Sequence, residues 1–416
     1  MSKPAKYKWT FRARFRAGAF GWRSQPAITR IKEAVSEIKK AARKDPVLGA
    51  EGAVLFLEKV SPALERIDSS SGAIGSAVYH AINTLVPIIV NAPAEDKVRD
   101  KWLDRLWVAF NEDQIPYIEQ LADWWGELCV TPERASLWVD DLIHPLLISW
   151  TDQRIRSYFQ GTSACLSSLL AAKRYRELLD LIEKAPIVWW HYRRFGSLAL
   201  AAMGKTDEAL EYAEKSVGRN DSPMAMTRAC EEILLEAGRV NEAYDRYAII
   251  SNERSTRLNT FRAIAGKYPL KDKAEILMDL IGSTPGSEGK WFATAKNLKQ
   301  YELAGKLANL SPCEPQTLNR AARDYMTENP EFALESATAS LRWISEGWGY
   351  EITALDIRSA FDYAMEAASK LDRTNEAVER IRSFAKNSDS PKDSDSPGEY
   401  ARQTIRRLLD SKAELK

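Results

Sequence analysis

The sequence has few of the residues that build metal centres and nucleophilic active sites. Its 416 residues include three histidines and four cysteines. The cysteines form no C-x-x-C pair, and no histidine lies at a metal-ligand spacing from a cysteine: Cys129, Cys165, Cys230, Cys313, His80, His144 and His191. We therefore expect reduced, mostly buried thiols, no metal ion and no cofactor.

Long apolar runs are also missing. The longest, LVPIIV at 85–90, is far shorter than the roughly 18 residues that a membrane span needs. The basic N-terminus is not followed by the apolar stretch of a secretory signal. Together with the cysteine pattern, this predicts a cytoplasmic protein without a membrane span.

Strand-like alternation is rare beyond the first 23 residues, whereas helical periodicity is common. In the segment 24–44, Ile28, Ile31, Val35 and Ile38 recur at helical spacing with charged residues between them. Similar patterns follow, separated by short turn signals, at 47–66, 73–90, 95–111, 114–128 and 133–148. The sequence predicts an all-α fold in which consecutive helices are antiparallel neighbours.

A repeat begins near residue 160. The segment 198–213 aligns without gaps to 232–247, so that Gly204 matches Gly238 at an offset of 34 residues. Poorer copies follow the same rhythm at 169–182, 297–312, 328–341 and 371–381. The period and the pattern G-x4-A-x3-A resemble the tetratricopeptide repeat, although the usual first-helix signature is absent. The resemblance covers roughly 155–385 and implies an α-solenoid, a tetratricopeptide-like superhelix whose concave face binds peptides or proteins.

A second resemblance lies in the N-terminal half. The segment 56–78 carries a stretch of the type D-S-S-G-x-x-G after a helix, with an extra serine. It is similar to a family of uncharacterised bacterial helical proteins, and the residues that match are Phe56, Asp68, Ser70, Ser71, Gly72 and Gly75. The resemblance implies an all-helical protein and no particular chemistry. We expect Ser70 or Ser71 to cap the next helix and the two glycines to allow close helix packing.

Composition divides the chain into five parts. The segment 386–399 contains S-D-S-P twice and no apolar residue before Tyr400, so it predicts disorder. The expected parts are a basic aromatic arm at 1–23, an N-terminal helical domain at 24–155, a repeat domain at 156–385, a disordered linker at 386–399 and an amphipathic helix at 400–416.

The arm is the most distinctive functional feature. Residues 6–23 hold six Lys or Arg, six aromatic residues and no acid. Residues 1–32 carry a charge of +9 and the whole chain +1, so the other residues sum to −8. Rings and cations alternate with period two, which predicts an extended arm with one aromatic face and one cationic face. Such an arm could dock on its own helices, bind a protein, or bind nucleic acid.

No catalytic constellation stands out, so the leading interpretation is a non-enzymatic scaffold that binds a protein or peptide through its concave face and its arm. The candidate partner-binding residues are Trp9, Phe11, Arg12, Arg14, Phe15, Arg16, Trp22 and Arg23. The alternative is a nucleic-acid-binding accessory protein of a mobile element or defence system, in which the arm's arginines contact phosphates. A third interpretation is an enzyme with a dispersed site among residues such as Asp68, Asp123 and Glu127.

Overall fold

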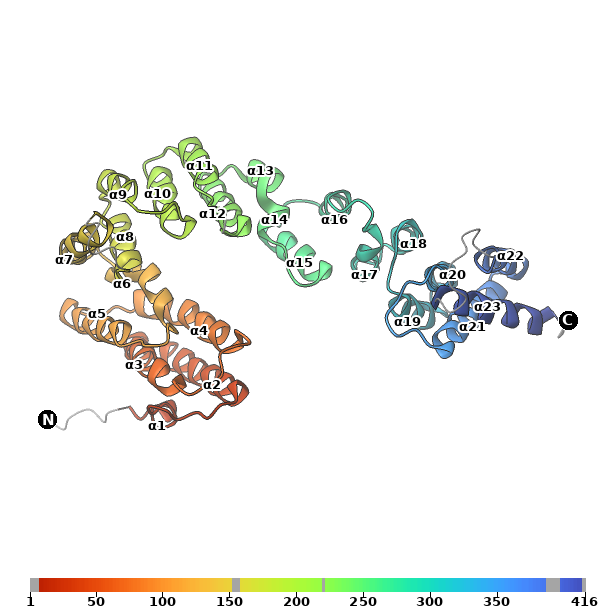
Figure 1. The fold of residues 1–416 in the computed structure, drawn as a ribbon, viewed down its shortest axis with the longest axis horizontal. Helices are drawn as coiled ribbons and strands as arrows, with labels where there is room; N and C mark the ends of the chain where they lie inside the picture. The colour runs from red at the N-terminus through yellow and green to blue at the C-terminus, as the bar shows by residue number, and fades with distance from the viewer. Residues whose placement is uncertain (1–6, 152–157, 219–220, 387–396, 414–416) are drawn as a thin grey trace. The chain divides into compact units, whose positions relative to one another are not determined.

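The computed structural model describes residues 7–151, 158–218, 221–386 and 397–413. These residues form helices and turns without a β-strand, which confirms the all-α prediction (Figure 1). The chain divides into two compact units, Met1–Arg239 and Val240–Lys416.

The N-terminal unit contains the first helices of the chain. They are α1 (Thr10–Arg14), α2 (Ser24–Ala42), α3 (Pro46–Leu64), α4 (Ala73–Val90), α5 (Asp96–Asn111), η1 (Glu119–Trp124), α6 (Trp125–Cys129), α7 (Pro132–Thr151), α8 (Thr162–Ala171), α9 (Tyr175–Ile182), α10 (Trp190–Ala202), α11 (Thr206–Lys215) and α12 (Pro223–Glu236). The boundary expected at 155/156 falls inside this unit, because α7 packs against α8.

The C-terminal unit contains the remaining helices. They are α13 (Val240–Ala243), a π-helical turn η2 (Tyr244–Ala248), α14 (Ile249–Ser251), α15 (Arg257–Lys267), α16 (Lys273–Gly282), η3 (Glu288–Trp291), α17 (Phe292–Asn297), α18 (Tyr301–Leu310), α19 (Pro315–Tyr325), α20 (Pro330–Ser345), α21 (Ala354–Lys370), α22 (Thr374–Phe384) and α23 (Pro397–Ala413).

The arm is not extended as expected. Thr10–Arg14 forms the short helix α1, which packs against α2 and α3. Phe11 and Phe15 are four residues apart, so a helical turn directs both rings to one side. A separation of four residues fits both a period-two strand pattern and a helical turn. The packing of α1 against α2 and α3 selects the helix.

α4 is the apolar helix of the N-terminal unit. By length and composition alone it is long enough to cross a membrane, which the short run at 85–90 did not suggest. One face is buried against α2 and α3, through Ile74, Val78, Ala81, Ile82, Leu85, Val86 and Ile89. The opposite face exposes Ser76, Tyr79 and His80. A buried face opposite a partly polar one is the pattern of a core helix in a folded domain.

A turn of constant local geometry recurs between consecutive helices. In each of five places a helix ends, two residues later the backbone takes a positive φ, and two residues after that the next helix begins. The positive-φ residues are Lys173, Gly204, Gly238, Lys299 and Asp372. Each donates its N–H to the carbonyl three residues back, and the following residue bonds five back, as Arg174 does to Leu169 at 3.0 Å and Arg373 to Ala368 at 2.8 Å. This is the Schellman motif.

The expected C-terminal helix is present and begins earlier than expected. α23 runs from Pro397 and packs against α20, α21 and α22 through Ala401, Ile405 and Leu409. The Arg402 guanidinium donates to the carbonyl of Ser345 at 2.7 Å. Of the disordered linker expected at 386–399, residues 387–396 lie outside the described residues, and the expectation is wrong for 397–399, which form the first turn of α23.

Candidate functional site

The aromatic residues of the arm are buried in the protein's own core. Trp9, Phe11 and Phe15 are 6%, 2% and 1% exposed. Phe11 and Phe15 both meet the ring of Phe56 on α3 edge to face, with centroids 5.9 and 5.2 Å apart. These three rings are therefore part of the fold, and they are not available as anchors for a partner.

A carboxylate of α2 holds the first turn of α1 in place. Glu37 accepts hydrogen bonds from the backbone N–H and the hydroxyl of Thr10, at 2.8 and 2.5 Å, and from the N–H of Phe11 at 3.2 Å. Arg14 pairs with the second carboxylate of α2, Glu33, at 2.8 Å. Both acids of α2 are thus engaged with the arm.

Four basic side chains next to the docked rings have no such partner. Lys8, Arg12 and Arg16 of the arm and Lys59 of α3 surround a hollow of about 550 Å³ that Tyr7, Trp9 and Ala13 also line. Within the described part of the chain, none of these four side chains makes a hydrogen bond or ion pair, and no carboxylate lines the hollow. We call these four residues the α1 basic patch.

The last two residues predicted for partner binding lie beyond α1. Trp22 is 72% exposed, and Arg23 is also exposed. The backbone here follows the end of α3, since Gly18 donates to the carbonyl of Pro62 at 2.9 Å and Asp68 donates to that of Trp22 at 3.0 Å. Among the aromatic residues predicted for the site, Trp22 alone remains accessible.

A second basic surface lies on the other flank of α2, between α2 and α4. It is a hollow of about 590 Å³ with an apolar floor and a basic rim. The floor is formed by Ile31, Val35, Ala77 and Ala81, and the rim by Lys32, Lys39, Lys40, Arg43, His80, Ser36 and Thr84. No described carboxylate lines it. We call this hollow the α2–α4 groove.

The charge of the α2–α4 groove follows from how α2 distributes its residues. Glu33 and Glu37 are one turn apart, so they lie on one flank of the helix, where α1 docks. Lys32, Lys39 and Lys40 lie on the flank that faces the groove. The arm thereby pairs with the acids of α2, and the lysines on the other flank have no ion-pair partner among the described residues.

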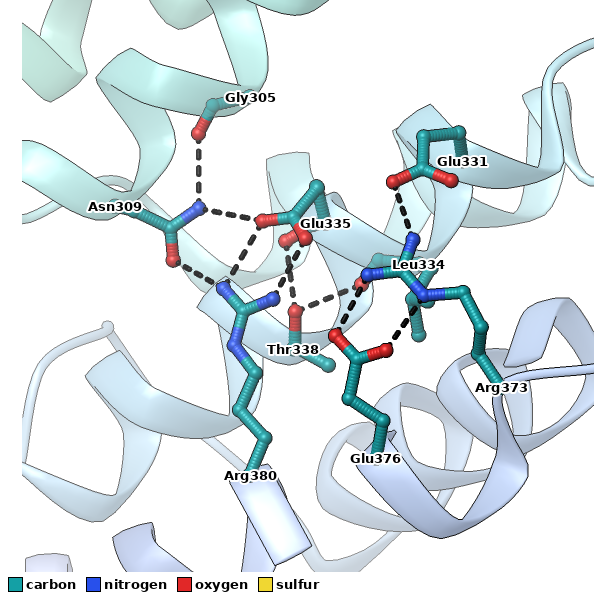
Figure 2. Close-up of polar contacts among 9 residues, drawn as sticks. All are labelled: Gly305, Asn309, Glu331, Leu334, Glu335, Thr338, Arg373, Glu376 and Arg380. Carbon is teal, nitrogen blue, oxygen red and sulfur yellow. Dashed lines mark hydrogen bonds and ion pairs between the residues drawn. The ribbon is translucent and has the colours of Figure 1, made fainter. Parts of the chain in front are cut away.

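A hollow of about 640 Å³ in the C-terminal unit has a different character, because its charges are paired. Figure 2 shows Arg380 of α22 donating to both oxygens of Glu335 on α20, at 2.6 and 3.0 Å, and to the side-chain oxygen of Asn309 on α18 at 2.9 Å. Asn309 in turn donates to Glu335 at 3.1 Å. This network joins three helices and satisfies the charges that a ligand would otherwise meet.

A neighbouring network continues the same pattern. Arg373 donates to Glu331 on α20 at 2.7 Å and to both oxygens of Glu376 at 2.6 and 2.7 Å (Figure 2). The lining of the hollow carries three acidic and three basic side chains, Glu302, Glu331, Glu335, Lys306, Arg342 and Arg380. A balanced lining of this kind is typical of helix packing and carries no preference for the charge of a ligand.

A smaller hollow of about 250 Å³ contains a serine, a histidine and an aspartate. Nε2 of His191 lies 3.0 Å from Oγ of Ser163 and 3.2 Å from Oδ1 of Asp123. In a catalytic triad the serine and the aspartate contact opposite nitrogens of the ring, whereas here both contact the same one. This geometry does not activate the serine.

Asp123 is instead a structural carboxylate. Burial raises its pKa, but the hydrogen bond from His191 and the charge of Arg194 outweigh this, and the net pKa is lower than usual. The Arg194 guanidinium lies 2.7 Å from Oδ1. Asp123 is therefore ionised at neutral pH and ties η1 to α10.

The loop that contains Asp68 also has a structural role. Asp68 accepts the N–H of Ser70 at 2.9 Å within a turn, and Gly72 caps α4 with φ 68°. Ser71 accepts the N–H of Ala73 at a long 3.4 Å. The expected close packing at the glycines is wrong, since a Cβ at Gly72 or Gly75 would meet nothing within 4 Å.

The thiols are buried and poorly reactive. All four cysteines are free, and burial raises the pKa of Cys129, Cys165 and Cys313 to about 12. In the ranges that the structure describes, no three His, Cys, Asp or Glu residues are grouped so that they could hold a metal ion.

Sequence reasoning identified the arm but missed the α2–α4 groove and the contribution of Lys59. The spacing of Glu33 and Glu37 was a usable signal, because it places both acids of a basic helix on one flank. Comparison of the chain with protein-family models, curated proteins and solved structures gives no match.

Proposed function

We propose that the protein is a non-enzymatic helical scaffold, and that the α2–α4 groove of its N-terminal unit binds an acidic amphipathic helix of a partner protein. The observation that carries this proposal is the lining of the groove, with an apolar floor, a basic rim and no described carboxylate. Aliphatic contact and a single sign of charge coincide on this surface.

Each part of the lining has a separate role. Leucine-sized side chains of the partner would bury against Ile31 and Val35, and each fully buried side chain contributes about 1.5–3 kcal/mol. Carboxylates on the flanks of the partner helix would face Lys39 and Arg43. Exposed charges of this kind contribute more to association rate and selectivity than to affinity. A helix lying in a groove is a common recognition mode for such a surface.

A non-catalytic role is supported by the geometry of the polar residues. Ser163 and Asp123 share one nitrogen of His191, and three of the thiols have pKa values of about 12. The charged side chains around Asn309 are paired across three helices. The buried free thiols are also compatible with the cytoplasmic location that the sequence suggests.

The architecture that would support this role is a tetratricopeptide-like α-solenoid of antiparallel helix pairs. Five Schellman turns of equal length, at the positions where the sequence repeats, support this arrangement. In three of them the residue after the turn is basic and pairs with a glutamate three residues on: Arg174 with Glu177, Lys205 with Glu208, and Arg373 with Glu376. The concave face of such a solenoid would be a further surface for the partner.

The proposal is tested with two synthetic peptides of about 20 residues, built from leucine and either glutamate or lysine in the same amphipathic pattern. Their binding to the full chain is measured by fluorescence anisotropy. We expect the acidic peptide to bind and the basic one not to bind. Equal binding of both peptides, or binding of neither, would contradict the proposal.

A charge-reversal pair locates the site. Lys39→Glu with Arg43→Glu places two acids on the rim, and we expect the acidic peptide to bind about tenfold more weakly or worse, which is about 1.4 kcal/mol. Lys97→Glu with Lys101→Glu is the matched control on α5, where both lysines are exposed. If the control pair weakened binding as much as the groove pair does, the α2–α4 groove would be excluded as the peptide-binding site.

A further inference from the structure

The α1 basic patch differs from the α2–α4 groove in what lies between its cations. Lys8, Arg12, Arg16 and Lys59 surround Tyr7, Trp9 and Ala13, with no aliphatic side chain larger than alanine. The ring of Trp9 is mostly buried and that of Tyr7 is exposed, so the hollow combines four positive charges with the edges of two aromatic rings. Four cations without a carboxylate suit an anion of repeated charge, and the hollow lacks the aliphatic floor of the α2–α4 groove.

The patch is held in a fixed position. The buried rings of Phe11 and Phe15 and the bonds from Glu37 fix α1 against α2 and α3. Arg12 and Arg16 are thus attached to ordered backbone, and Lys59 belongs to a long helix. Because the platform is fixed, little backbone order has to be gained on binding.

Nearby acids are occupied elsewhere. Residues 1–32 contain none, and Glu33 is bound by Arg14 and Arg30. Glu58, the sequence neighbour of Lys59, forms two hydrogen bonds with Arg105, each of 2.7 Å. The positive charge of the patch is therefore not compensated by the residues around it.

From these observations we infer that the α1 basic patch binds the phosphate backbone of nucleic acid. Backbone phosphates supply the repeated negative charge that four unpaired cations around one hollow require. A bilayer surface is the less suitable partner, because membrane-binding faces present a continuous apolar face, whereas here Trp9, Phe11 and Phe15 are buried and the exposed ring in the hollow is the single Tyr7. Tyr7, which is exposed in the hollow, can stack on a base, and such stacking tolerates any base, so binding does not depend on base sequence.

The test is a salt titration of the full chain with a labelled duplex of about 20 base pairs of mixed sequence, long enough to cover the patch. Each phosphate contact contributes about −0.9 to the slope of log K against log salt, so four contacts predict about −3.6. Affinity then falls on the order of 100-fold between 50 and 200 mM salt. Absence of binding at 50 mM salt would overturn the inference.

Matched variants separate this site from the α2–α4 groove. Arg12→Ala with Arg16→Ala removes two contacts, and we expect the slope to become shallower by about 1.8. Lys39→Ala with Lys40→Ala removes the same charge from the groove and is expected to leave the slope unchanged. Arg14→Ala, whose side chain is paired with Glu33, is a second control. The inference fails if the groove pair changes the slope and the α1 pair does not.

Two further readouts separate the partners. The first is binding of the full chain to anionic vesicles. If it binds the vesicles more tightly than the duplex, and the Arg12→Ala, Arg16→Ala variant does not bind them, the nucleic-acid assignment is overturned in favour of a membrane. Binding of the acidic peptide to the Arg12→Ala, Arg16→Ala variant is expected to be unchanged. The two proposals therefore succeed or fail independently.

Discussion

The indole ring of Trp9 packs directly on the backbone of α3 at Gly52. A Cβ atom at Gly52 would lie 2.3 Å from the ring, well inside van der Waals contact. The arm can therefore dock only because position 52 has no side chain. This one relationship joins the basic N-terminus to the helical core.

Gly52→Ala is expected to destabilise the protein although it replaces glycine within a helix. Alanine at an unhindered helical position gains about 1 kcal/mol, whereas overpacking costs about 1–3 kcal/mol. Urea denaturation, followed by tryptophan fluorescence, measures the difference in free energy of unfolding between wild type and variant. In a Trp9→Ala background the same change is expected to stabilise, and stabilisation in both backgrounds would contradict the docking of Trp9.

Phe15→Ala tests whether the arm is part of the fold. The ring is fully buried against Phe56, so its removal is expected to cost about 3–5 kcal/mol in the free energy of unfolding. Trp22→Ala removes a larger ring from the same segment, but one that is exposed, and is expected to change stability by less than about 0.5 kcal/mol. Equal effects of the two variants would show that Phe15 is not buried.

The lowered pKa of Asp123 predicts that the folded protein loses stability in acid. Its pKa is lower in the folded protein than the ordinary value of about 3.9, so its contribution to stability is present above that value and is lost as the pH falls through the folded pKa. Asp123→Asn lacks this contribution. In urea titrations the difference in free energy of unfolding between wild type and variant is expected to narrow as the pH falls below about 4. A constant gap down to pH 3 would contradict this prediction.

At the positive-φ position of the recurring turns, introducing glycine and removing glycine are expected to change stability in opposite directions. Lys299 has φ 60° and Gly204 has φ 79° at equivalent places. Lys299→Gly removes a strained conformation and is expected to stabilise by about 1 kcal/mol, while Gly204→Ala is expected to destabilise by a similar amount. Thermal unfolding of both variants measures these shifts. Shifts of the same sign would show that the two turns are not equivalent.

The helical class was predictable because the apolar residues of segments such as 24–44 repeat at helical spacing over several turns. The aligned glycines Gly204 and Gly238 also marked two of the turns in the sequence, because glycine readily takes the positive φ that these turns require. The equivalent turns at Lys173, Lys299 and Asp372 carry no glycine, and their identity depends on backbone hydrogen bonds that no residue type reveals.

The site was predictable only in part, because it is assembled by tertiary contacts. The arginines of the arm were identified, but the helical conformation of Thr10–Arg14 depends on Glu37, which lies 27 residues along the chain. Lys59 joins Arg16 only through the docking of α1 on α3. The α2–α4 groove needs His80 of α4 beside Lys39 of α2, and sequence periodicity does not say which helices pack together.

The most direct test of the proposed function is to map where an acidic amphipathic peptide binds. A photo-reactive version of the peptide is crosslinked to the full chain, and the products are mapped by mass spectrometry. We predict crosslinks concentrated on α2 and α4, around Lys39, Arg43 and His80. Crosslinks concentrated on the helices around Asn309, or spread as evenly as those of a scrambled peptide, would contradict the proposed function.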